Sequence, residues 1–511
     1  MHEIVTYTSS VPFLAVLVSL AAVPLIYASS NRPNMREFWT LAAAFIKFPL
    51  VLSLLPGVMA GEVAEFTIVQ ISASPDIALK LRADGVGMLF AVVASGLWIL
   101  TSFYSIGYMR GANEKKQTRY FASFAVCLSA TIGIAFSANL LTFLIFYEIL
   151  SLATYPLVIH KENQEAMRSG RQYLLYAMSA GVVLIAGIGI TYSIAGTLDF
   201  KPGGIFGGIV LDPVLIKVAF ILFIAGVGVK AGIMPLQSWL PAAMVAPTPV
   251  SALLHAVAVV KAGVFGVIRV VGFIFGPEVM HEFSLNLILA TFSGATVILA
   301  SLIALNQDDL KRRLAYSTVG HLSYIVLGVA LLTPEGFTGG LLHLSNHATT
   351  KICLFFCAGA IYVNLHKTKI SQLDGIGRVM PWTMGAFTIG ALGLAGVPPI
   401  NAFVSKWFLC QGAMAADQTI ILGIFLLSGL LNAAYFFPIV QRAFFRPGGK
   451  DLEKHGEASP FMVVPICIVA TLSVLLGLQP NLFLNLYDLA AGISQSVFQL
   501  PAVFIASGVW P

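Results

Sequence analysis

Apolar segments follow one another along almost the whole chain, and most are about 18 to 25 residues long. A helix of roughly 20 apolar residues is long enough to cross the hydrocarbon core of a bilayer. Together with the turn residues between the segments, the pattern predicts about fourteen membrane-spanning helices. We place them near residues 11–29, 38–60, 86–108, 120–138, 140–159, 172–196, 214–237, 250–275, 285–305, 314–333, 338–364, 381–414, 417–441 and 459–478. The less apolar tail, residues 480–511, leaves open an interfacial helix or a further entry into the membrane.

The composition supports this class of protein. Hydrophobic residues make up 58% of the chain and charged residues 10%, against roughly 25% charged residues in a soluble domain. We therefore expect an all-α, polytopic membrane protein in contact with the lipid bilayer. The net charge of +6 would suggest a nucleic-acid partner in a soluble protein, but no such partner is expected here. The five cysteines all lie in apolar segments, which favours small buried side chains over disulfides, metal sites or iron–sulfur clusters. No cofactor is expected.

The basic residues predict the orientation of the helices. If the N-terminus lies outside, the outer loops receive only Lys80, Arg82, Lys201 and Lys217, and the inner loops receive all the other loop lysines and arginines. Lys and Arg favour the cytoplasmic side of a membrane protein. We expect the inner (plasma) membrane of a bacterium. The run 11–29 has no basic residue before it and no small-residue cleavage site, so it is expected as the first membrane helix rather than a removed signal.

Two predicted spans are interrupted. The seventh contains Gly232 and Pro235, and the twelfth contains Gly396, Pro398 and Pro399. Proline removes a backbone donor, and a broken membrane helix is tolerated only where protein or water satisfies the freed groups. Two such breaks in different halves of the chain are typical of inverted repeats with an ion site near the middle of the membrane. Two ordinary proline kinks remain the alternative.

Charged residues inside the spans are the first candidates for chemistry. A charge near the bilayer centre costs at least about 2.5–3.5 kcal/mol, which makes it a functional candidate by default. Only one acidic residue, Glu148, lies well inside a span. The basic residues inside predicted spans are Lys47, Lys230, Lys261, Arg269, Lys351 and Lys406. Lys47 and Arg269 could instead extend to an interface, and both interpretations stay open.

Lysine is suited to proton transfer. Its free pKa is about 10.4, desolvation lowers that pKa by several units, and a nearby carboxylate raises it again. A change in the distance between Glu148 and Lys230 would therefore load or unload a proton.

Histidines extend this row of lysines. On the predicted eleventh span His343, His347 and Lys351 recur every four residues and share one face. Imidazole titrates near neutrality and can pass a proton with either nitrogen. Two further histidines, His255 and His321, lie on the eighth and tenth spans. Because Lys351 shares the face of the other two, no metal or haem is expected, while a hydrogen-bonded core role remains the alternative for any single histidine.

An ordered set of motifs covers residues 85–445. They are Phe146-Tyr147-Glu148 with Tyr155, Lys230-Ala231-Gly232-Ile233-Met234-Pro235 with Trp239 and Pro241, Ala246-Pro247-Thr248-Pro249 with His255, Lys261 with Arg269, Asp309-Leu310-Lys311-Arg312-Arg313, His347 with Lys351, and Gly396-Val397-Pro398-Pro399 with Phe403 and Lys406. By these motifs the sequence resembles the antiporter-like subunits shared by respiratory complex I, membrane-bound hydrogenases and Mrp-type cation/proton antiporters. It is similar to the shorter members, including the shorter antiporter-like subunit of the Mrp type. One motif departs: the family's Ser-Gln-x-Gly-Tyr reads Gly320-His321-Leu322-Ser323-Tyr324 here, which adds a titratable group.

The resemblance implies fourteen helices with two inverted five-helix repeats and breaks in the seventh and twelfth. The implied regions are 1–110 (helices 1–3), 111–280 (first repeat), 281–445 (second repeat) and 446–511 (helix 14 and tail). It also implies roles for single residues. Glu148 and Lys230 would form an input pair, and Lys406 would exchange protons with the outer side. Asp309 and Lys311 would brace the broken helix at the inner surface. The residues that would bridge the halves are His255, Lys261, His343, His347 and Lys351.

Three functions are consistent with these residues. The first is the proton-translocating subunit of a multisubunit Na⁺/H⁺ antiporter of the Mrp type, with other membrane subunits as partners and protons and Na⁺ as the ions moved. The second is a proton-pumping subunit of a complex I-like NADH-quinone oxidoreductase or a membrane-bound hydrogenase. The third, from another class, is a stand-alone proton-coupled solute transporter. In the first two, translocation belongs to the complex, since the chain carries no redox centre of its own.

Overall fold

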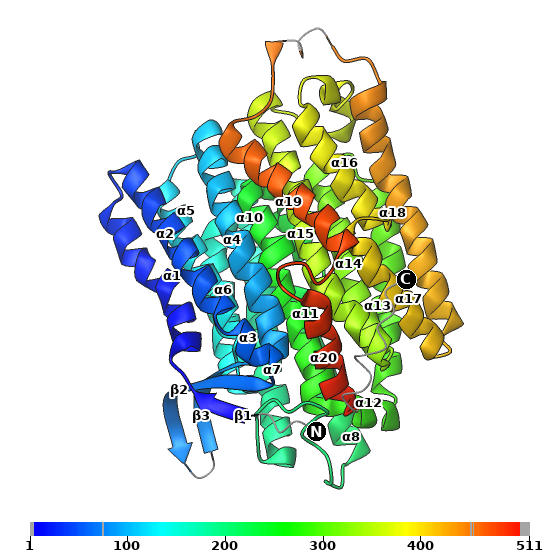
Figure 1. The fold of residues 1–511 in the computed structure, drawn as a ribbon. Coiled ribbons are helices and arrows are strands. Elements are labelled where there is room, and N and C mark those ends of the chain that lie inside the picture. Colours follow the sequence, from blue (N-terminus) through cyan, green and yellow to red (C-terminus); the bar gives the residue numbers. More distant parts are fainter. Residues whose placement is uncertain (1–4, 74–75, 450–451, 453, 501–511) are drawn as a thin grey trace.

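Long, nearly parallel helices form one bundle in the computed structural model, which describes residues 5–73, 76–449, 452 and 454–500 (Figure 1). Within the described residues, 12 helical segments are long and apolar enough to cross a membrane. They are α1 (Val11–Ala28), α2 (Pro33–Leu52) continued by α3 (Leu55–Met59), α4 (Gly85–Gly111), α5 (Gln117–Ala135), α6 (Leu140–Val158), α7 (Gln164–Ala195), α8 (Pro213–Ala231), the composite segment Thr248–Glu282, α13 (Leu285–Leu305), α15 (Pro334–Leu365), α18 (Thr419–Phe445) and α19 (Pro460–Leu478). The predicted class, an all-α polytopic membrane protein, is confirmed.

Two more predicted spans are present in altered form. The tenth is α14 (Leu310–Ala330), whose first turn is rich in Lys and Arg. The twelfth is two short helices, α16 (Pro381–Ala395) and α17 (Asn401–Ala415). Neither α16 nor α17 alone is long enough to cross a bilayer. The total of fourteen spans stays a prediction.

The two predicted breaks lie at α8 and at α16. Each helix ends on a glycine with positive φ, Gly232 (φ 70°) and Gly396 (φ 94°). A residue with a side chain rarely adopts this conformation, and glycine adopts it readily. After α8 the chain continues through α9 (Trp239–Ala242) and η1 (Ala243–Val245). The breaks are therefore complete interruptions of the helix, not kinks.

The composite segment after the first break is itself irregular. It consists of α10 (Thr248–Ala252), the π-helix η2 (Leu253–Val257), α11 (Val259–Arg269), the π-helix η3 (Val270–Phe275) and α12 (Gly276–Glu282). π-helical turns are rare and are found mostly at functional sites. One of the predicted site residues, His255, lies in η2.

The helices α5 to α8 and α13 to α17 follow the same plan. In each series the third helix, α7 or α15, has 32 residues and the fourth is broken. The second helix begins at a side-chain cap in both, Asn139 for α6 and Asp309 for α14. Each capping residue also forms an isolated antiparallel bridge to the loop beyond the third helix, Asn139 with Asp199 and Asp309 with Lys369. These matched features fit two inverted repeats, and the boundaries 111–280 and 281–445 stay predictions.

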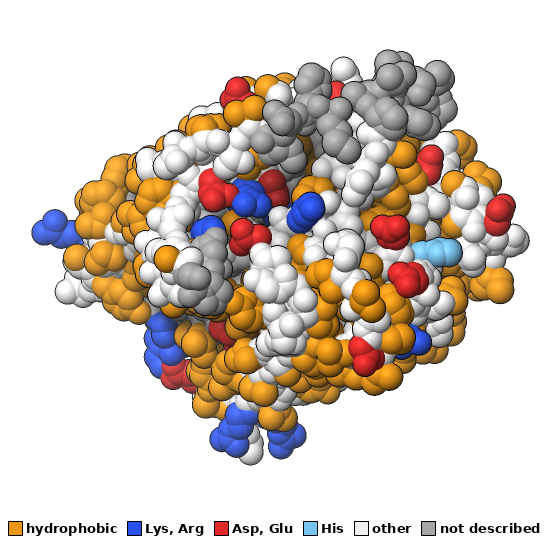
Figure 2. All heavy atoms as spheres, turned by 90° about the horizontal axis from the view of Figure 1, so that it is seen from below, with side chains coloured by type: hydrophobic (Ala, Val, Ile, Leu, Met, Phe, Trp, Pro, Cys, Tyr) orange, Lys and Arg blue, Asp and Glu red, His pale blue; other side chains and the backbone are white. Residues whose placement is uncertain are grey.

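A small sheet is present that the sequence pattern does not predict. Strand β1 (Val5–Thr8) pairs in parallel with β2 (Glu62–Ala73), which pairs antiparallel with β3 (Asp76–Ala83). The sheet lies at the end of the bundle where α1, α4 and α6 begin, here called the sheet side (Figure 1). Figure 2 looks onto this side and shows acidic and basic side chains close together near its middle, with apolar side chains around the rim.

Short elements complete the chain. Turns η4 (Ile370–Gln372) and η5 (Ile376–Arg378) lie between α15 and α16. The tail contains α20 (Leu486–Phe498), whose buried residues recur every three to four positions, as in an amphipathic helix. Its Ser494 donates a hydrogen bond to the carbonyl of Pro334, 2.8 Å away, at the start of α15. The tail therefore packs on the bundle as far as it is described, and residues 501–511 of the region left open lie outside the described residues.

Candidate functional site: a buried row of lysines and histidines

The row is built around α15. His343, His347 and Lys351 lie on one face of this helix, and all three are fully buried. Each reaches a different neighbouring helix. The Nδ1 atom of His347 lies 3.0 Å from Nζ of Lys261 on α11, and Lys351 Nζ donates to Oγ of Ser317 on α14 at 2.9 Å. α15 thus connects the eighth-span segment with α14.

A cluster of three histidines occupies the middle of the second half. His321 Nδ1 lies 3.1 Å from His343 Nε2, and His343 Nδ1 lies 2.8 Å from Oγ of Ser405 on α17. The His321 and His347 rings are 5.5 Å apart between centroids. A continuous hydrogen-bonded chain therefore runs from His321 through His343 to Ser405. Sequence reasoning assigns His321 no role and misses Ser405, because a serine gives no signal of its own.

Tyr324 lies beside this cluster. Its ring stacks on those of His321 and His343 at 5.2 and 5.4 Å between centroids. The ammonium of Lys406 lies 5.1 Å from the centroid of the same ring. A tyrosine ring offers a cation both a negative face and a barrier to solvent. Tyr324 thus contacts Lys406 and the histidines at the same time.

Lys406 is positioned by the break in the twelfth span. In a regular helix the carbonyl of Leu394 would accept from the amide of residue 398, but residue 398 is proline and has no N–H. Lys406 Nζ donates to this carbonyl at 2.6 Å, and Asn432 Nδ2 donates to it at 3.2 Å. The break thus supplies an oxygen that holds the lysine, which is only 9% exposed.

Lys230 lies at the end of α8, next to the first break. Its Nζ donates to the carbonyl of Tyr147 at 2.6 Å and lies 3.3 Å from the centroid of the Tyr147 ring. The carbonyl of Val229 accepts from Nε1 of Trp239 at 2.7 Å, so Trp239 closes the broken end. Gly263 of α11 lies against this end, because a Cβ there would come within 2.1 Å of the amide nitrogen of residue 231. The helices that carry Lys230 and Lys261 are therefore in backbone contact.

Glu148 and Lys230 form no direct ion pair in the described part of the chain. Both carboxylate oxygens of Glu148 are buried there without a hydrogen-bond partner. The carboxylate lies against α7, where a Cβ on Gly181 would be 2.5 Å from Oε1. The carboxylate and the ammonium still interact electrostatically. The implied input pair is therefore adjacent but separated in this conformation.

His255 is the least connected residue of the row. It is fully buried in the π-helical turn, beside the ring of Phe355 at 5.2 Å. Neither of its ring nitrogens has a hydrogen-bond partner among the described residues. Ser251, one turn earlier, likewise has a buried hydroxyl without a partner there. Buried polar groups are nearly always hydrogen-bonded, so such an exception points to a functional or hydrated position.

Two intramembrane cations lie outside this row. Lys47 is fully buried, donates to Ser19 and lies 5.0 Å from the Trp98 ring. Arg269 is 1% exposed and forms a two-fold hydrogen-bonded ion pair with Asp84, at 2.6 and 2.8 Å. Of the two interpretations left open for each cation, extension to an interface is wrong for both.

The inner-surface residues expected to brace the broken helix lie around it. Lys311 Nζ donates to the carbonyl of Ala246, just beyond η1, at 2.6 Å. Asp309 caps α14 by accepting from the amide of Arg312 at 2.8 Å. Lys311 thus ties the segment after the first break to the start of α14. In the part of the chain that the structure describes, no group of three or more His, Cys, Asp or Glu side chains is arranged to hold a metal ion.

The geometry defines a class: a polytopic membrane protein with two broken helices and a row of buried Lys and His side chains running across the bundle. The family model described as NADH:quinone oxidoreductase/Mrp antiporter, TM matches residues 137–432. A second, described as NADH-Ubiquinone oxidoreductase (complex I), chain 5 N-terminus, matches residues 70–121. The chain belongs to the NADH:quinone oxidoreductase/Mrp antiporter membrane family, as the motifs predicted.

Relatives come from several branches of this family. NADH-quinone oxidoreductase subunit N of Desulforudis audaxviator is 30% identical over 77% of this chain and 82% of its own. Hydrogenase-4 component B of Escherichia coli is 30% identical over 84% of this chain and 66% of its own. Na(+)/H(+) antiporter subunit A1 of Staphylococcus aureus is 28% identical over 92% of this chain. The chain spans only 61% of that antiporter subunit, so it matches part of a longer protein.

Two solved structures share the fold. A chain of the Mrp complex from Dietzia sp. superposes with a TM-score of 0.84 at 21% identity, over 98% of both chains. A chain of the membrane-bound sulfane sulfur reductase, an archaeal respiratory membrane complex, gives 0.83 at 23% identity, over 96% of this chain and 100% of its own.

Proposed function

We propose that the chain is the proton-translocating subunit of a multisubunit Na⁺/H⁺ antiporter of the Mrp type, in the plasma membrane of a bacterium. The observation that carries this proposal is the buried row itself, with its hydrogen-bonded chain from His321 through His343 to Ser405. Burying so many ionisable groups is costly, and a structural role would not require them to line up. The fold shared with a chain of an Mrp complex supports the assignment of type.

In this proposal protons move between the two breaks. Glu148 and Lys230 act at one end, where a movement that closes the gap between them would raise the affinity of Lys230 for a proton. Lys261 hands protons to His347, its hydrogen-bond partner. The histidine cluster carries them to Lys406, which exchanges them with the sheet side. His255 and Lys351 complete the bridge between the halves.

A transport assay tests the row. The complete assembly is expressed in a strain without its own Na⁺/H⁺ antiporters, and growth in Na⁺ is measured together with dissipation of a pH gradient in inverted vesicles. Lys230→Ala and Lys406→Ala are expected to reduce exchange to background, because no other group at these positions would hold the proton. Glu148→Ala is expected to lower exchange about tenfold, because Lys230 would then lack the carboxylate that favours its charged form.

Lys47→Ala is the matched control, since Lys47 is as deeply buried but lies outside the row. It is expected to keep exchange near the wild-type rate at equal abundance in the membrane. If exchange survived all three changes in the row, the proposed path would be wrong.

A second candidate function is supported by the 30% identity to subunit N of a NADH-quinone oxidoreductase. In that case the chain would pump protons within a complex I-like or hydrogenase assembly. Purification from native membranes distinguishes the two. Other membrane subunits without redox centres would indicate the antiporter, and a soluble arm with flavin and iron–sulfur clusters would indicate the respiratory complex. A stand-alone solute transporter would purify alone.

A further inference from the structure

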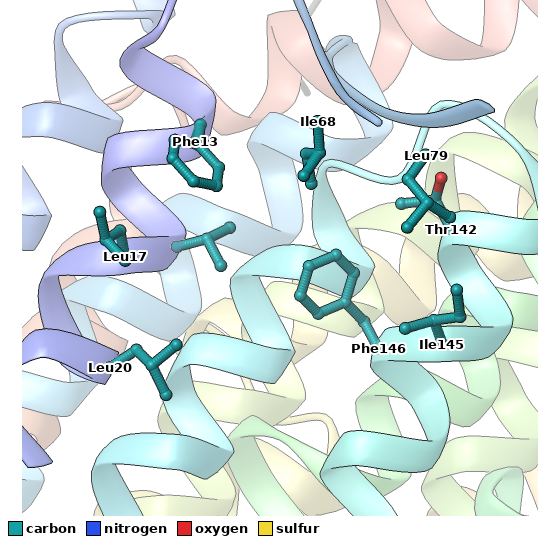
Figure 3. Close-up of a pocket in the computed structure, with 9 residues that line it drawn as sticks. Phe13, Leu17, Leu20, Ile68, Leu79, Thr142, Ile145 and Phe146 are labelled. Atoms are coloured by element: carbon teal, nitrogen blue, oxygen red, sulfur yellow. The ribbon is translucent and has the colours of Figure 1, made fainter. Parts of the chain in front are cut away.

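An apolar cleft lies outside the row, between α1, the sheet and α6 (Figure 3). Its volume is about 220 Å³. The walls include Phe13, Leu17 and Leu20 of α1, Ile68 of β2, and Ile145 and Phe146 of α6. In Figure 3 the side chains of α1 and α6 face each other across the space, with Ile68 and Leu79 from the strands on a third side. The proposed proton path does not use this cleft.

The cleft lies within the membrane, in the half next to the sheet. Both α1 and α6 begin on the sheet side, and the lining residues come from their first halves. From Phe13 to Leu20 the cleft follows α1 for about 10 Å at 1.5 Å per residue. Leu17 and Leu20 are 37% and 44% exposed. Because this surface faces the hydrocarbon of the bilayer, the cleft opens sideways into lipid.

The sheet closes the cleft toward water. The rings of Phe13 and Phe66 stack at 5.0 Å between centroids, and Ile68 and Leu79 lie beyond them on the two paired strands. The only hydroxyl of the lining residues belongs to Thr142, and it accepts a hydrogen bond from the amide of Lys80 at 3.0 Å. Side chains of the described residues therefore offer an occupant an apolar surface with its one polar group already engaged.

We propose that the cleft holds one acyl chain of a membrane lipid from the sheet-side leaflet. The volume exceeds that of an apolar cavity of about 150 Å³ that takes up benzene. A space of this kind that opens to hydrocarbon is filled because its lining otherwise lacks contact partners on one side. The charged groups of the neighbouring strand do not select a headgroup, since Arg82 lies 2.8 Å from Glu65 and Lys80 lies 3.9 Å from Asp199. The site therefore recognises the acyl chain rather than the headgroup.

Photo-labelling of the full chain in its assembly tests the proposal. The assembly is reconstituted with phospholipid that carries a diazirine in one acyl chain, irradiated and mapped by mass spectrometry. Labelling per residue at Leu17, Leu20 and Phe146 is expected to exceed several-fold that at Leu427 and Leu430 of α18, two lipid-facing controls that are 49% and 71% exposed. Phospholipids with ethanolamine and glycerol headgroups are expected to give equal labelling.

A filling variant gives the decisive comparison. Val16→Phe, which adds a ring inside the cleft, is expected to reduce cleft labelling to the level of α18, whereas Leu427→Phe on α18 is expected to leave it unchanged. Wild-type labelling at the cleft no higher than at α18, or labelling unaffected by the filling variant, would overturn the proposal. Cross-links from the cleft to a protein segment instead of lipid would also overturn it. The readout is binding, so it is independent of whether the chain moves protons.

Discussion

The two halves of the buried row are connected differently. In the second half His321, His343 and Ser405 form direct hydrogen bonds of 3.1 and 2.8 Å. In the first half Glu148 has no hydrogen-bond partner among the described residues, and Lys230 is held by the carbonyl and ring of Tyr147. A proton can pass along the second half by small shifts within existing hydrogen bonds, whereas the first half requires a side chain to move. The first half therefore has the properties of a switch, and the second half those of a conductor.

The largest expected effect comes from breaking the conductor. His343→Gln removes the group that bonds to both His321 and Ser405, and is expected to lower ion exchange roughly a hundredfold, within the range for loss of a positioned proton carrier. His255→Gln, which removes a residue without hydrogen bonds from its ring among the described residues, is expected to lower it only about tenfold. Gradient dissipation in inverted vesicles measures both. Equal losses in the two variants would show that the hydrogen-bonded chain has no special weight.

A smaller effect is expected from shifting the switch without removing its charge. Gly181→Ala would place a Cβ 2.5 Å from Glu148 Oε1 and 2.8 Å from its Cδ, so the carboxylate must move. Ion exchange is expected to change several-fold, with Glu148 chemically intact. Gly189→Ala on the same helix is the control, because nothing lies within 4 Å of its Cβ position. A wild-type rate for the Gly181 variant would mean that the position of the carboxylate does not limit transport.

The smallest effect on transport is expected at Arg269, a buried cation that belongs to neither half. Asp84→Asn leaves its guanidinium without a counter-charge, and the pair is 1% and 20% exposed at its two ends. We expect a loss of about 2–3 kcal/mol in unfolding free energy, less than for a completely buried pair. Thermal unfolding in detergent measures it, and exchange at permissive temperature is expected to stay within about twofold of wild type.

Asp374→Asn provides the comparison for that measurement. Asp374 pairs with Arg442 and Arg446 at 3.1 and 3.8 Å, and all three side chains are at least 27% exposed. An exposed ion pair contributes at most about 1 kcal/mol. If the two variants lost equal stability, the burial of Arg269 would not be what makes its pair important.

The spans and both breaks could be predicted from the sequence because a bilayer imposes a minimum length of apolar helix and because glycine and proline restrict the backbone. The sheet could not, since β1 and β2 alternate weakly and are largely exposed. The candidate residues could be found because a charge in an apolar segment is conspicuous. Their partners could not, because Ser317, Ser405 and the Leu394 carbonyl become special only when helices distant in the sequence pack together. Likewise His321 gains a role only from its contact with His343.

The helix α15 carries members of both halves on one uninterrupted segment. From His343 to Lys351 it contains neither glycine nor proline, and the two residues are about 12 Å apart along the axis. A stiff rod of this kind cannot shift at one end alone. A small rotation that lengthens the contact between His343 and Ser405 must also alter those of His347 with Lys261 and of Lys351 with Ser317. Protonation at one end of α15 can therefore be felt at the other mechanically, before any charge has travelled between them.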